Sequence, residues 1–199
     1  MPTVALEQGA RSRYALPMFT DLLHWFVHDA RIWVTEIARA HPHWCFPIAF
    51  GIAFSESFAG ISVLIPGFAL LLALGGVIGA SDIGLLPAVL GAALGAVGGD
   101  WISWWLGQRY HHQILHLWPF RSFEAQIEKA LHFFHRWGAW AVFFGRFLGP
   151  FRATVPLVAG MSKLELRPFL IASLSSALIW ATVLLAFPAW VTRIFTINY

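Results

Sequence analysis

Charged side chains are missing from long parts of this chain, and this absence limits what it can fold into. The nearly charge-free stretches are residues 44–81, 83–108, 137–162 and 169–192. The only Asp, Glu, Lys or Arg residues within them are Glu56, Asp100, Arg146 and Arg152. A bilayer core accommodates apolar runs of about 20 residues and penalises ionised groups inside them. The pattern therefore predicts an all-α membrane protein.

Composition also indicates a surface that meets lipid. Hydrophobic residues make up 58% of the 199 residues and charged residues 12%, against roughly 45–50% and about 25% in soluble proteins. The chain has 11 Trp and 18 Phe, and Trp favours the headgroup level of a bilayer. The net charge of +3 is slight, so no nucleic-acid partner is expected. One cysteine, Cys45, excludes an internal disulfide and a cysteine metal cluster.

Two of the stretches are predicted to be continuous crossing helices. The run 169–192 carries no charge and is long enough to cross with some tilt, with Trp180 and Trp190 as anchors. The run 83–108 ends in WISWWLGQR, which places its three tryptophans near an interface. Asp82 precedes this second run and is expected to cap its helix.

The other two stretches are interrupted by proline and glycine. The first contains Pro66 and Gly67, and the second contains Pro150, Pro156 and Gly160, which are the expected break residues. Proline removes a backbone donor, so the freed backbone groups at membrane depth need partners from the protein or from water in a cavity. We therefore expect two broken, re-entrant helical hairpins, and two Pro-kinked spanning helices are the alternative.

The domain organisation follows from these segments. We expect a disordered N-terminus at 1–17, an amphipathic interfacial helix at 18–43 and a membrane domain at 44–199, with halves 44–108 and 137–192 joined by an amphipathic connection at 109–136. In the connection, apolar residues recur at helical spacing at Phe123, Ile127, Leu131 and Phe134.

The order of amphipathic helix, broken segment and crossing helix thus occurs twice. If each broken segment re-enters its own side, the second half is inverted relative to the first, as in many secondary transporters. An offset of 90 residues places Glu56 on Arg146 and Pro66 on Pro156. An acid in one broken segment is therefore expected to face a base in the other.

The embedded arginines need a physical reason, because each costs about 2.5–3.5 kcal/mol at a helix centre on insertion scales. A bend at Pro150 lets Arg146 and Arg152 converge. Their guanidinium groups suit carboxylate or phosphate oxygens. Two roles stay open: the arginines bind an anionic substrate, or they neutralise Glu56 and Asp100 and hold the halves together.

The two embedded acids, Glu56 and Asp100, also have alternative roles. Burial favours the protonated form of a carboxyl and a nearby guanidinium favours the ionised form, so Glu56 is a candidate for loading and releasing a proton. Asp100 precedes the tryptophan cluster and is expected to lie shallower, as a coupling acid or as an interfacial or helix-packing residue.

Other chemistry is not expected. The pairs His112/His116 and His132/His135 have a spacing that suits metal ligands, but no acid or cysteine completes a motif, so we expect solvated histidines and no metal or other cofactor. The stretch LLALGGVIGA lacks the Lys and Ser/Thr of a phosphate loop, which favours close helix packing. No nucleophile with a plausible base lies in the membrane segments, so the chain is not expected to be an enzyme.

Three motifs resemble the bacterial DedA family, whose members share the SNARE-associated or VTT domain. The resemblance covers roughly residues 46–190. The segment FGRFLGPFRATVPLVAG is similar to the family pattern of Arg, Pro, Arg, Pro and Gly, which here are Arg146, Pro150, Arg152, Pro156 and Gly160. FSESFAGISVLIPG resembles the acidic first hairpin, with Glu56 as its acid. GGDWISWW resembles the Gly-Asp motif, with Asp100 as its acid.

Two positions depart from the family pattern. Family members often carry a second acid directly after the Pro-Gly of the first hairpin, and here that residue is Phe68. The aromatic residue after the Gly-Asp motif is usually Tyr and here is Trp104. Either Asp100 or Asp82 replaces the missing acid, or proton coupling is altered.

The resemblance implies two re-entrant hairpins facing one another in a transporter of the bacterial inner membrane. It favours proton-coupled translocation of a lipid phosphate, foremost undecaprenyl phosphate, in support of envelope homeostasis. Arg146 and Arg152 are then the phosphate-binding residues, and Glu56 and Asp100 are the proton-coupling residues. The expected partners are protons and membrane lipids with a polyprenyl or phospholipid phosphate, and a homo-oligomer stays open. The alternatives are a proton-coupled carrier of a small ion or oxyanion and a non-transporting membrane scaffold.

Overall fold

A computed structural model describes residues 32, 36–38, 40–58, 67–81, 83–116 and 124–197. Within these ranges the regular elements are all helical. They are η1 Pro42–Trp44, α2 Cys45–Ser57, α3 Gly67–Gly79, α4 Leu85–His116, α5 Glu124–Trp137, α6 Ala139–Gly145, η3 Gly149–Ala153, α7 Thr154–Met161 and α8 Leu166–Ile197. The predicted all-α class is confirmed. The predicted segment 1–17, Pro66 and Asp82 lie outside the described residues, as does most of 18–43.

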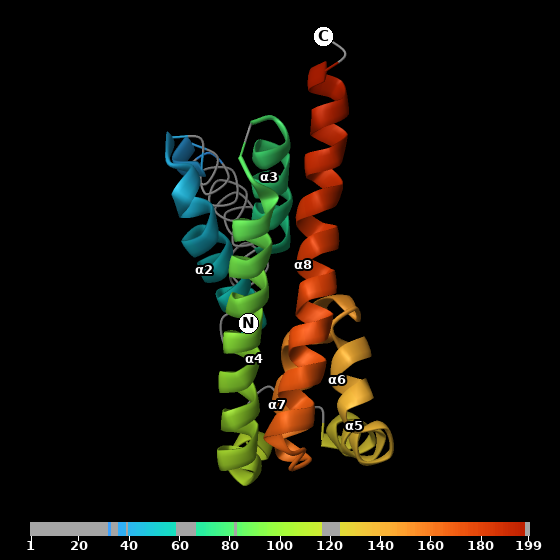
Figure 1. Ribbon diagram of the computed structural model, residues 1–199. Helices are drawn as coiled ribbons and strands as arrows, with labels where there is room; N and C mark the ends of the chain where they lie inside the picture. Colours follow the sequence, from blue (N-terminus) through green and yellow to red (C-terminus); the bar gives the residue numbers. More distant parts are fainter. Residues whose placement is uncertain are drawn as a thin grey trace, which may run out of the picture.

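The two long helices α4 and α8 run the length of the molecule in opposite directions (Figure 1). Leu85–Tyr110 of α4 and Leu166–Phe195 of α8 are long and apolar enough to cross a membrane, since a hydrocarbon core of about 30 Å needs about 20 helical residues. Both helices are longer than predicted. Helix α4 continues past a kink at Tyr110, and α8 continues through Pro188.

Short helices flank the long ones at opposite ends. Helices α2 and α3 lie beside the upper part of α4 and α8 in Figure 1, and α6 and α7 lie beside the lower part. At the upper end, α2 packs mainly on α4 and α3 on α8; at the lower end, α7 packs mainly on α4 and α6 on α8. Each end therefore has one short helix against each long helix.

The predicted break at Pro150 is confirmed, because η3 separates α6 from α7 there. The chain turns at residues 146–148 and continues as η3, where Gly149 has φ +61°, a conformation that favours glycine. Pro156 and Gly160, expected as break residues, both lie inside α7. A helix tolerates proline in its first turn, and Gly160 allows close packing, because a Cβ there would collide with the backbone carbonyl of Trp104.

Glycines on α4 allow α2 to approach its backbone. Gly91, Gly95 and Gly99 are four residues apart, and a Cβ on any of them would collide with a backbone carbonyl of α2. Gly75 and Gly79 of α3 make the same kind of approach to α8. Small residues bring helix backbones together in membrane proteins, where burial from water contributes little. The close packing expected of LLALGGVIGA is therefore confirmed.

Two tryptophans predicted at interfaces are buried instead. Trp104 is 6% exposed, and its indole N–H donates to the carbonyl oxygen of Leu164 at 3.1 Å. Trp180 is 8% exposed in the middle of α8. A buried indole needs a partner for its polar edge or its π face, and these two obtain one from distant parts of the chain. The other tryptophans predicted at interfaces, Trp101, Trp105 and Trp190, are exposed.

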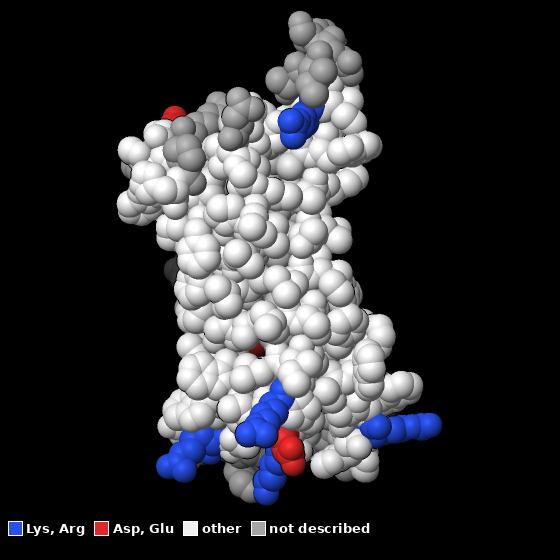
Figure 2. Space-filling model, in the orientation of Figure 1, with Lys and Arg blue, Asp and Glu red and all other residues white. Residues whose placement is uncertain are grey.

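The surface separates into an apolar band and charged ends. In Figure 2 the Lys and Arg side chains gather at the lower end, and the middle of the visible face is almost free of charge. Large apolar side chains are exposed along α4 and α8, among them Leu94, Ile171, Ile179 and Val183. A surface of this kind suits lipid rather than water.

Helix α5 confirms a helix in the amphipathic connection. It lies across the lower end of the bundle and is seen nearly end-on in Figure 1. Of its predicted apolar face, Phe134 is buried and Leu131 is partly buried, whereas Phe133 and Trp137 are exposed. Phe123 and the side chain of Ile127 lie outside the described part of the chain.

Candidate functional site

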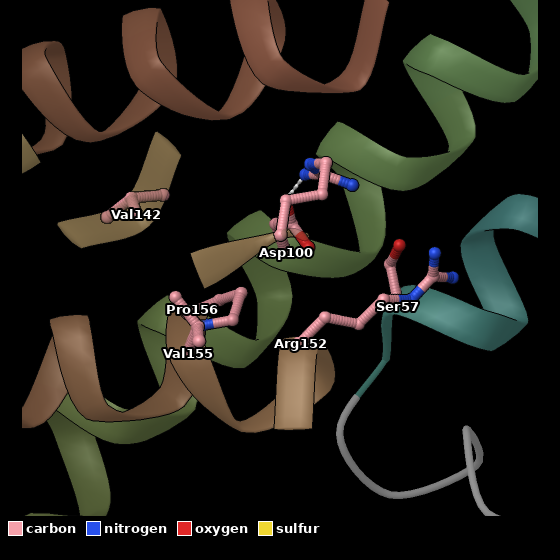
Figure 3. Close-up of a pocket in the computed structure, with 7 residues that line it drawn as sticks. Ser57, Asp100, Val142, Arg152, Val155 and Pro156 are labelled. Carbon is pink, nitrogen blue, oxygen red and sulfur yellow. Dashed lines mark hydrogen bonds and ion pairs between the residues drawn. The ribbon is translucent and has the colours of Figure 1, made fainter. Parts of the chain in front are cut away.

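The four charged residues of the apolar stretches come from four places in the fold. Glu56 ends α2, Asp100 lies within α4, Arg146 follows α6 and Arg152 lies in η3. A small cavity of about 10 Å³, room for about one water molecule, lies among these elements (Figure 3). It is lined by Ser57, Asp100, Val142, Arg146, Arg152, Val155 and Pro156. The predicted convergence of the two arginines is confirmed, because both line this cavity.

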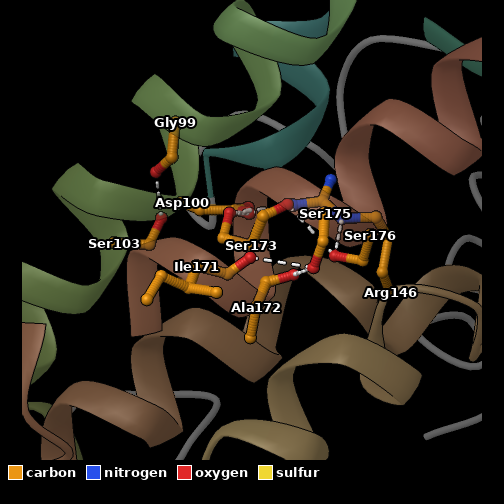
Figure 4. A network of polar contacts seen from close by, with 9 residues as sticks. All are labelled: Gly99, Asp100, Ser103, Arg146, Ile171, Ala172, Ser173, Ser175 and Ser176. Atoms are coloured by element: carbon orange, nitrogen blue, oxygen red, sulfur yellow. Dashed lines mark hydrogen bonds and ion pairs between the residues drawn. The ribbon is translucent and has the colours of Figure 1, made fainter. Parts of the chain in front are cut away.

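Arg146 and Asp100 form one buried ion pair, which α8 completes (Figure 4). Arg146 is 6% exposed and Asp100 is 3% exposed. Arg146 Nη2 donates to Asp100 Oδ2 and to Ser173 Oγ, the latter at 3.2 Å, and Arg146 Nε donates to Ser176 Oγ at 3.0 Å. Ser173 Oγ also donates to Asp100 Oδ2 at 2.6 Å. Both charges therefore have hydrogen-bond partners.

Asp100 is buried between α4 and α8, as the helix-packing alternative expects, and is not an exposed interfacial acid. Its burial follows from the facing elements, because α8 places Ser173 opposite it and the turn after α6 supplies Arg146. The pairing of a carboxylate with a guanidinium offsets part of the cost of burying either charge.

Glu56 and Arg152 form the second ion pair. Arg152 Nη2 lies 2.7 Å from Glu56 Oε1, and the side chains are 10% and 12% exposed for Arg152 and Glu56. The guanidinium carbon lies 4.3 Å from the centre of the Trp180 ring, a distance at which a cation is attracted to the π face. In Figure 3 Arg152 extends from η3 toward α2 beside Ser57. The pair therefore joins the upper and lower short helices.

This second pair is less completely hydrogen-bonded than the first. Glu56 Oε2 and Arg152 Nη2 are both buried, and neither has a hydrogen-bond partner among the residues that the structure describes. The 2.7 Å contact is close but lacks the alignment of a hydrogen bond. Buried polar atoms without partners are costly. The Glu56–Arg152 pair thus retains capacity for a further polar group.

The observed ion pairs differ in part from those that the 90-residue repeat alignment predicted. An acid of the first interrupted stretch does face a base of the second, as predicted. The base is Arg152, whereas the repeat alignment placed Arg146 at the position matching Glu56. Positions that are equivalent in two repeats need not contact each other, and Arg146 instead contacts Asp100.

Three site residues were missed by the sequence reasoning. Ser173, Ser176 and Trp180 lie on α8 at spacings of three and four residues, which places them on one face of the helix. The available signal was the presence of two serines inside a charge-free crossing helix, because polar side chains in such helices usually face a protein partner.

Gly67, the first residue of α3, closes over Glu56. A Cβ at this position would lie 2.5 Å from Glu56 Oε2 and 2.9 Å from Glu56 Cβ. The next side chain, Phe68, occupies the place of the usual family acid and is 53% exposed. The exposed side chain of Phe68 takes no part in the buried Glu56–Arg152 pair. An acid is therefore not needed at position 68 for this pair to form.

We expect Gly67→Ala to lower the free energy of unfolding by about 1–3 kcal/mol, because the added methyl group must displace Glu56. Thermal unfolding in detergent, followed by circular dichroism, measures this loss. Gly76→Ala is the matched control on the same helix, since its nearest neighbour, Thr192 Oγ1, is 3.6 Å from the added Cβ. Equal stability of the two variants would contradict the close contact at Gly67.

Metal binding finds no support in the described region. No group of three or more His, Cys, Asp or Glu side chains lies close enough there to hold an ion. His132 and His135 are exposed, and the side chains of His112 and His116 fall outside the described part.

Comparison with known proteins identifies the family. The VTT domain matches residues 65–189, which is more than half of the chain. This chain belongs to the DedA/VTT family. Asp100, Arg146 and Arg152 lie within the matched region, and Glu56 precedes it. No solved structure matches the chain.

Several membrane proteins are similar to this DedA/VTT chain. Inner membrane protein YabI of Escherichia coli K12 is 37% identical over 130 residues, covering 65% of this chain and 51% of YabI. The uncharacterized membrane protein BU139 of Buchnera aphidicola is 32% identical over 143 residues, covering 72% of this chain and 56% of that protein. Protein DedA of E. coli K12 is 24% identical over 166 residues, covering 80% and 76%. The chain spans about half the length of YabI and BU139.

Proposed function

We propose that this protein is a transporter that moves a lipid phosphate, foremost undecaprenyl phosphate, across the inner membrane with proton coupling. The observation that carries the proposal is the pair of buried arginine–carboxylate contacts where the upper and lower short helices meet. Ionisable groups at membrane depth are costly and mark substrate or proton pathways. The name of YabI, an inner membrane protein, supports the proposed location.

We infer that the short helices form two re-entrant hairpins. Helices α2 and α3 have 13 residues each, and α6 and α7 have 7 and 8. At about 1.5 Å per residue, none of them reaches across a hydrocarbon core of about 30 Å. Each pair therefore enters from one end and returns to it, and the tips bring Glu56 and Arg152 together near the middle.

The ion pairs suggest how substrate and proton compete. Guanidinium groups bind phosphate oxygens as well as carboxylates. The cavity in this state is too narrow for a phosphate group, so the anion must take the place of a carboxylate. A carboxylate that leaves its arginine in an apolar site favours taking up a proton. Phosphate binding and proton uptake are thereby linked, with the lipid tail remaining against the apolar surface.

The proposal is tested by leaflet exchange in proteoliposomes. Purified protein is reconstituted, and transfer of undecaprenyl phosphate between leaflets is followed with and without a proton gradient. We expect acceleration over empty vesicles, and a loss of about tenfold or more in Arg152→Ala, because a charge-assisted contact to the phosphate is removed. Arg167→Ala, which changes an exposed arginine at the lower end, is the control. Full activity of Arg152→Ala would refute the role of this site.

A second candidate is a proton-coupled carrier of a small ion or oxyanion, which the small volume of the cavity favours. Such a carrier accumulates solute and needs no lipid headgroup. Flux of inorganic phosphate into the same vesicles, without leaflet exchange of the lipid, would favour it.

A membrane scaffold is the third candidate, and the pairing of all four buried charges favours it. In a scaffold the charges serve only to hold the helices together. The double exchange Glu56→Arg with Arg152→Glu would then preserve function in cells, whereas a transporter that binds phosphate at residue 152 would lose it. We propose no chemical conversion of the substrate and therefore no enzyme activity.

A further inference from the structure

The two ion pairs differ in how completely the protein satisfies them. We propose that Arg152, held on the face of Trp180, is the arginine that exchanges its carboxylate for an anionic phosphate group. Arg146, held by Asp100, Ser173 and Ser176, is a fixed link between α4, α6 and α8. This inference rests on the proposed function and narrows the phosphate-binding group from two arginines to one.

Arg146 is engaged on several sides at once. A guanidinium group has five N–H donors, and three hydrogen bonds use those of Nε and Nη2, to Ser176, Asp100 and Ser173. Releasing Asp100 would leave a buried carboxylate with only the Ser173 hydroxyl and would also disturb the contacts on α8. Exchange at Arg146 would therefore break its hydrogen bond to Asp100 and leave that buried carboxylate with one partner fewer.

Arg152 is held differently. Its Nη2 lies 2.7 Å from Glu56 Oε1 without the alignment of a hydrogen bond. Its guanidinium carbon lies over the Trp180 ring, 4.3 Å from the ring centre. This contact holds the cation without using its N–H donors, and a phosphate can accept paired hydrogen bonds from those donors. Glu56 can therefore leave without releasing Arg152.

The unpartnered atoms lie at the place where exchange is proposed. Glu56 Oε2 and Arg152 Nη2 are the buried side-chain atoms without a hydrogen-bond partner in the described part of the chain. Arg152 also lines the cavity. An oxygen of a phosphate group that reached Arg152 Nη2 would satisfy this donor, and protonation would give Glu56 a donor of its own. The ligand is a phosphate monoester or free phosphate, which share this chemistry.

Binding and stability measurements distinguish the proposed phosphate-binding role of Arg152 from the proposed structural role of Arg146. The purified full chain in detergent is titrated with inorganic phosphate in one arm and with undecaprenyl phosphate in another, by isothermal calorimetry. Trp180→Leu is expected to weaken binding of the phosphate probe by about three- to thirtyfold, the range of a desolvated cation–π contact. Trp180→Phe keeps an aromatic face and is expected to recover part of the affinity. Binding of the lipid alone identifies a headgroup site, and binding of both identifies a general phosphate site.

The double variant Ser173→Ala with Ser176→Ala is expected to lower stability more than it lowers phosphate affinity. The double variant loses hydrogen bonds of Arg146, so its Tm falls, while the affinity of the folded protein for phosphate changes less than in Trp180→Leu. Ser175→Ala is the matched control, because Ser175 donates only to backbone carbonyls of its own helix, those of Ile171 and Ala172.

Three outcomes would overturn the inference. The first is a loss of phosphate affinity in the folded serine double variant equal to that of Trp180→Leu. The second is an unchanged affinity for phosphate in both Trp180→Leu and Arg152→Lys. Arg152→Lys keeps the positive charge but removes the paired N–H donors of the guanidinium group. It also replaces Trp180→Leu as the test if that variant does not fold. The third is wild-type protein that binds neither probe. Failure of the proposed function is separate, because it appears as normal phosphate binding without leaflet exchange in vesicles.

Discussion

Asp100→Ala is expected to lower the free energy of unfolding by about 3–5 kcal/mol, the cost of breaking a buried ion pair from one side. The substitution leaves the Arg146 guanidinium, 6% exposed, without its carboxylate. It also removes the acceptor of the Ser173 hydroxyl. Denaturant or thermal unfolding of the purified protein in detergent measures the effect.

Two further variants separate charge from local packing. Glu165→Ala removes an exposed acid at the lower end and should change stability by less than about 0.5 kcal/mol. Asp100→Leu combined with Arg146→Met removes both charges and should recover most of the loss, because a pair of buried charges is often no more stable than apolar groups of similar size. If Asp100→Ala alone costs less than about 1 kcal/mol, the pair is not buried as described.

Gly95→Val is expected to separate α2 from α4 and to cost about 3 kcal/mol, the upper part of the range for overpacking a tight contact. A Cβ at Gly95 would collide with the backbone of Phe50, which cannot rotate aside as a side chain can. Because α2 carries Glu56, the same shift moves the carboxylate away from Arg152. We therefore expect loss of leaflet exchange together with the fall in Tm.

Alanine scanning of glycines gives the matched comparison. Gly51 lies on α2 with no atom within 4 Å of an added Cβ, so Gly51→Ala should be neutral or stabilising by up to about 1 kcal/mol through helix propensity. Gly95→Ala should be destabilising despite the same gain in propensity. Effects of the same sign and size at both positions would show that α2 and α4 do not approach as closely as described.

The crossing helices were predictable because hydrophobicity and length are local properties. The predicted runs 83–108, with Asp100 as its only charge, and 169–192, with none, correspond largely to parts of α4 and α8. Their ends were predicted too short, since exposed charged residues such as Arg109, Arg167 and Arg193 continue these helices at the ends of the bundle. Long basic side chains extend toward the interface and permit such continuation.

The partners of the buried charges were only partly predictable. The apolar stretches around them were enough to predict that four charged residues have a special role, because an ionised group is costly in any run long enough to enter the bilayer. These residues are Glu56, Asp100, Arg146 and Arg152. Which acid meets which base depends on the relative rotation and height of helices far apart in the chain. The repeat alignment could therefore not predict that Glu56 pairs with Arg152.

The sequence by itself determined the all-helical membrane class, the two crossing helices and the four embedded charges, since each depends on a stretch of consecutive residues and its cost in lipid. Only the tertiary structure decided that Asp100 is buried between helices, that Trp180 covers Arg152 and that Ser173 and Ser176 hold Arg146. Those features are contacts between different helices, and the backbone approach permitted by glycines such as Gly95 and Gly99 sets which side chains meet.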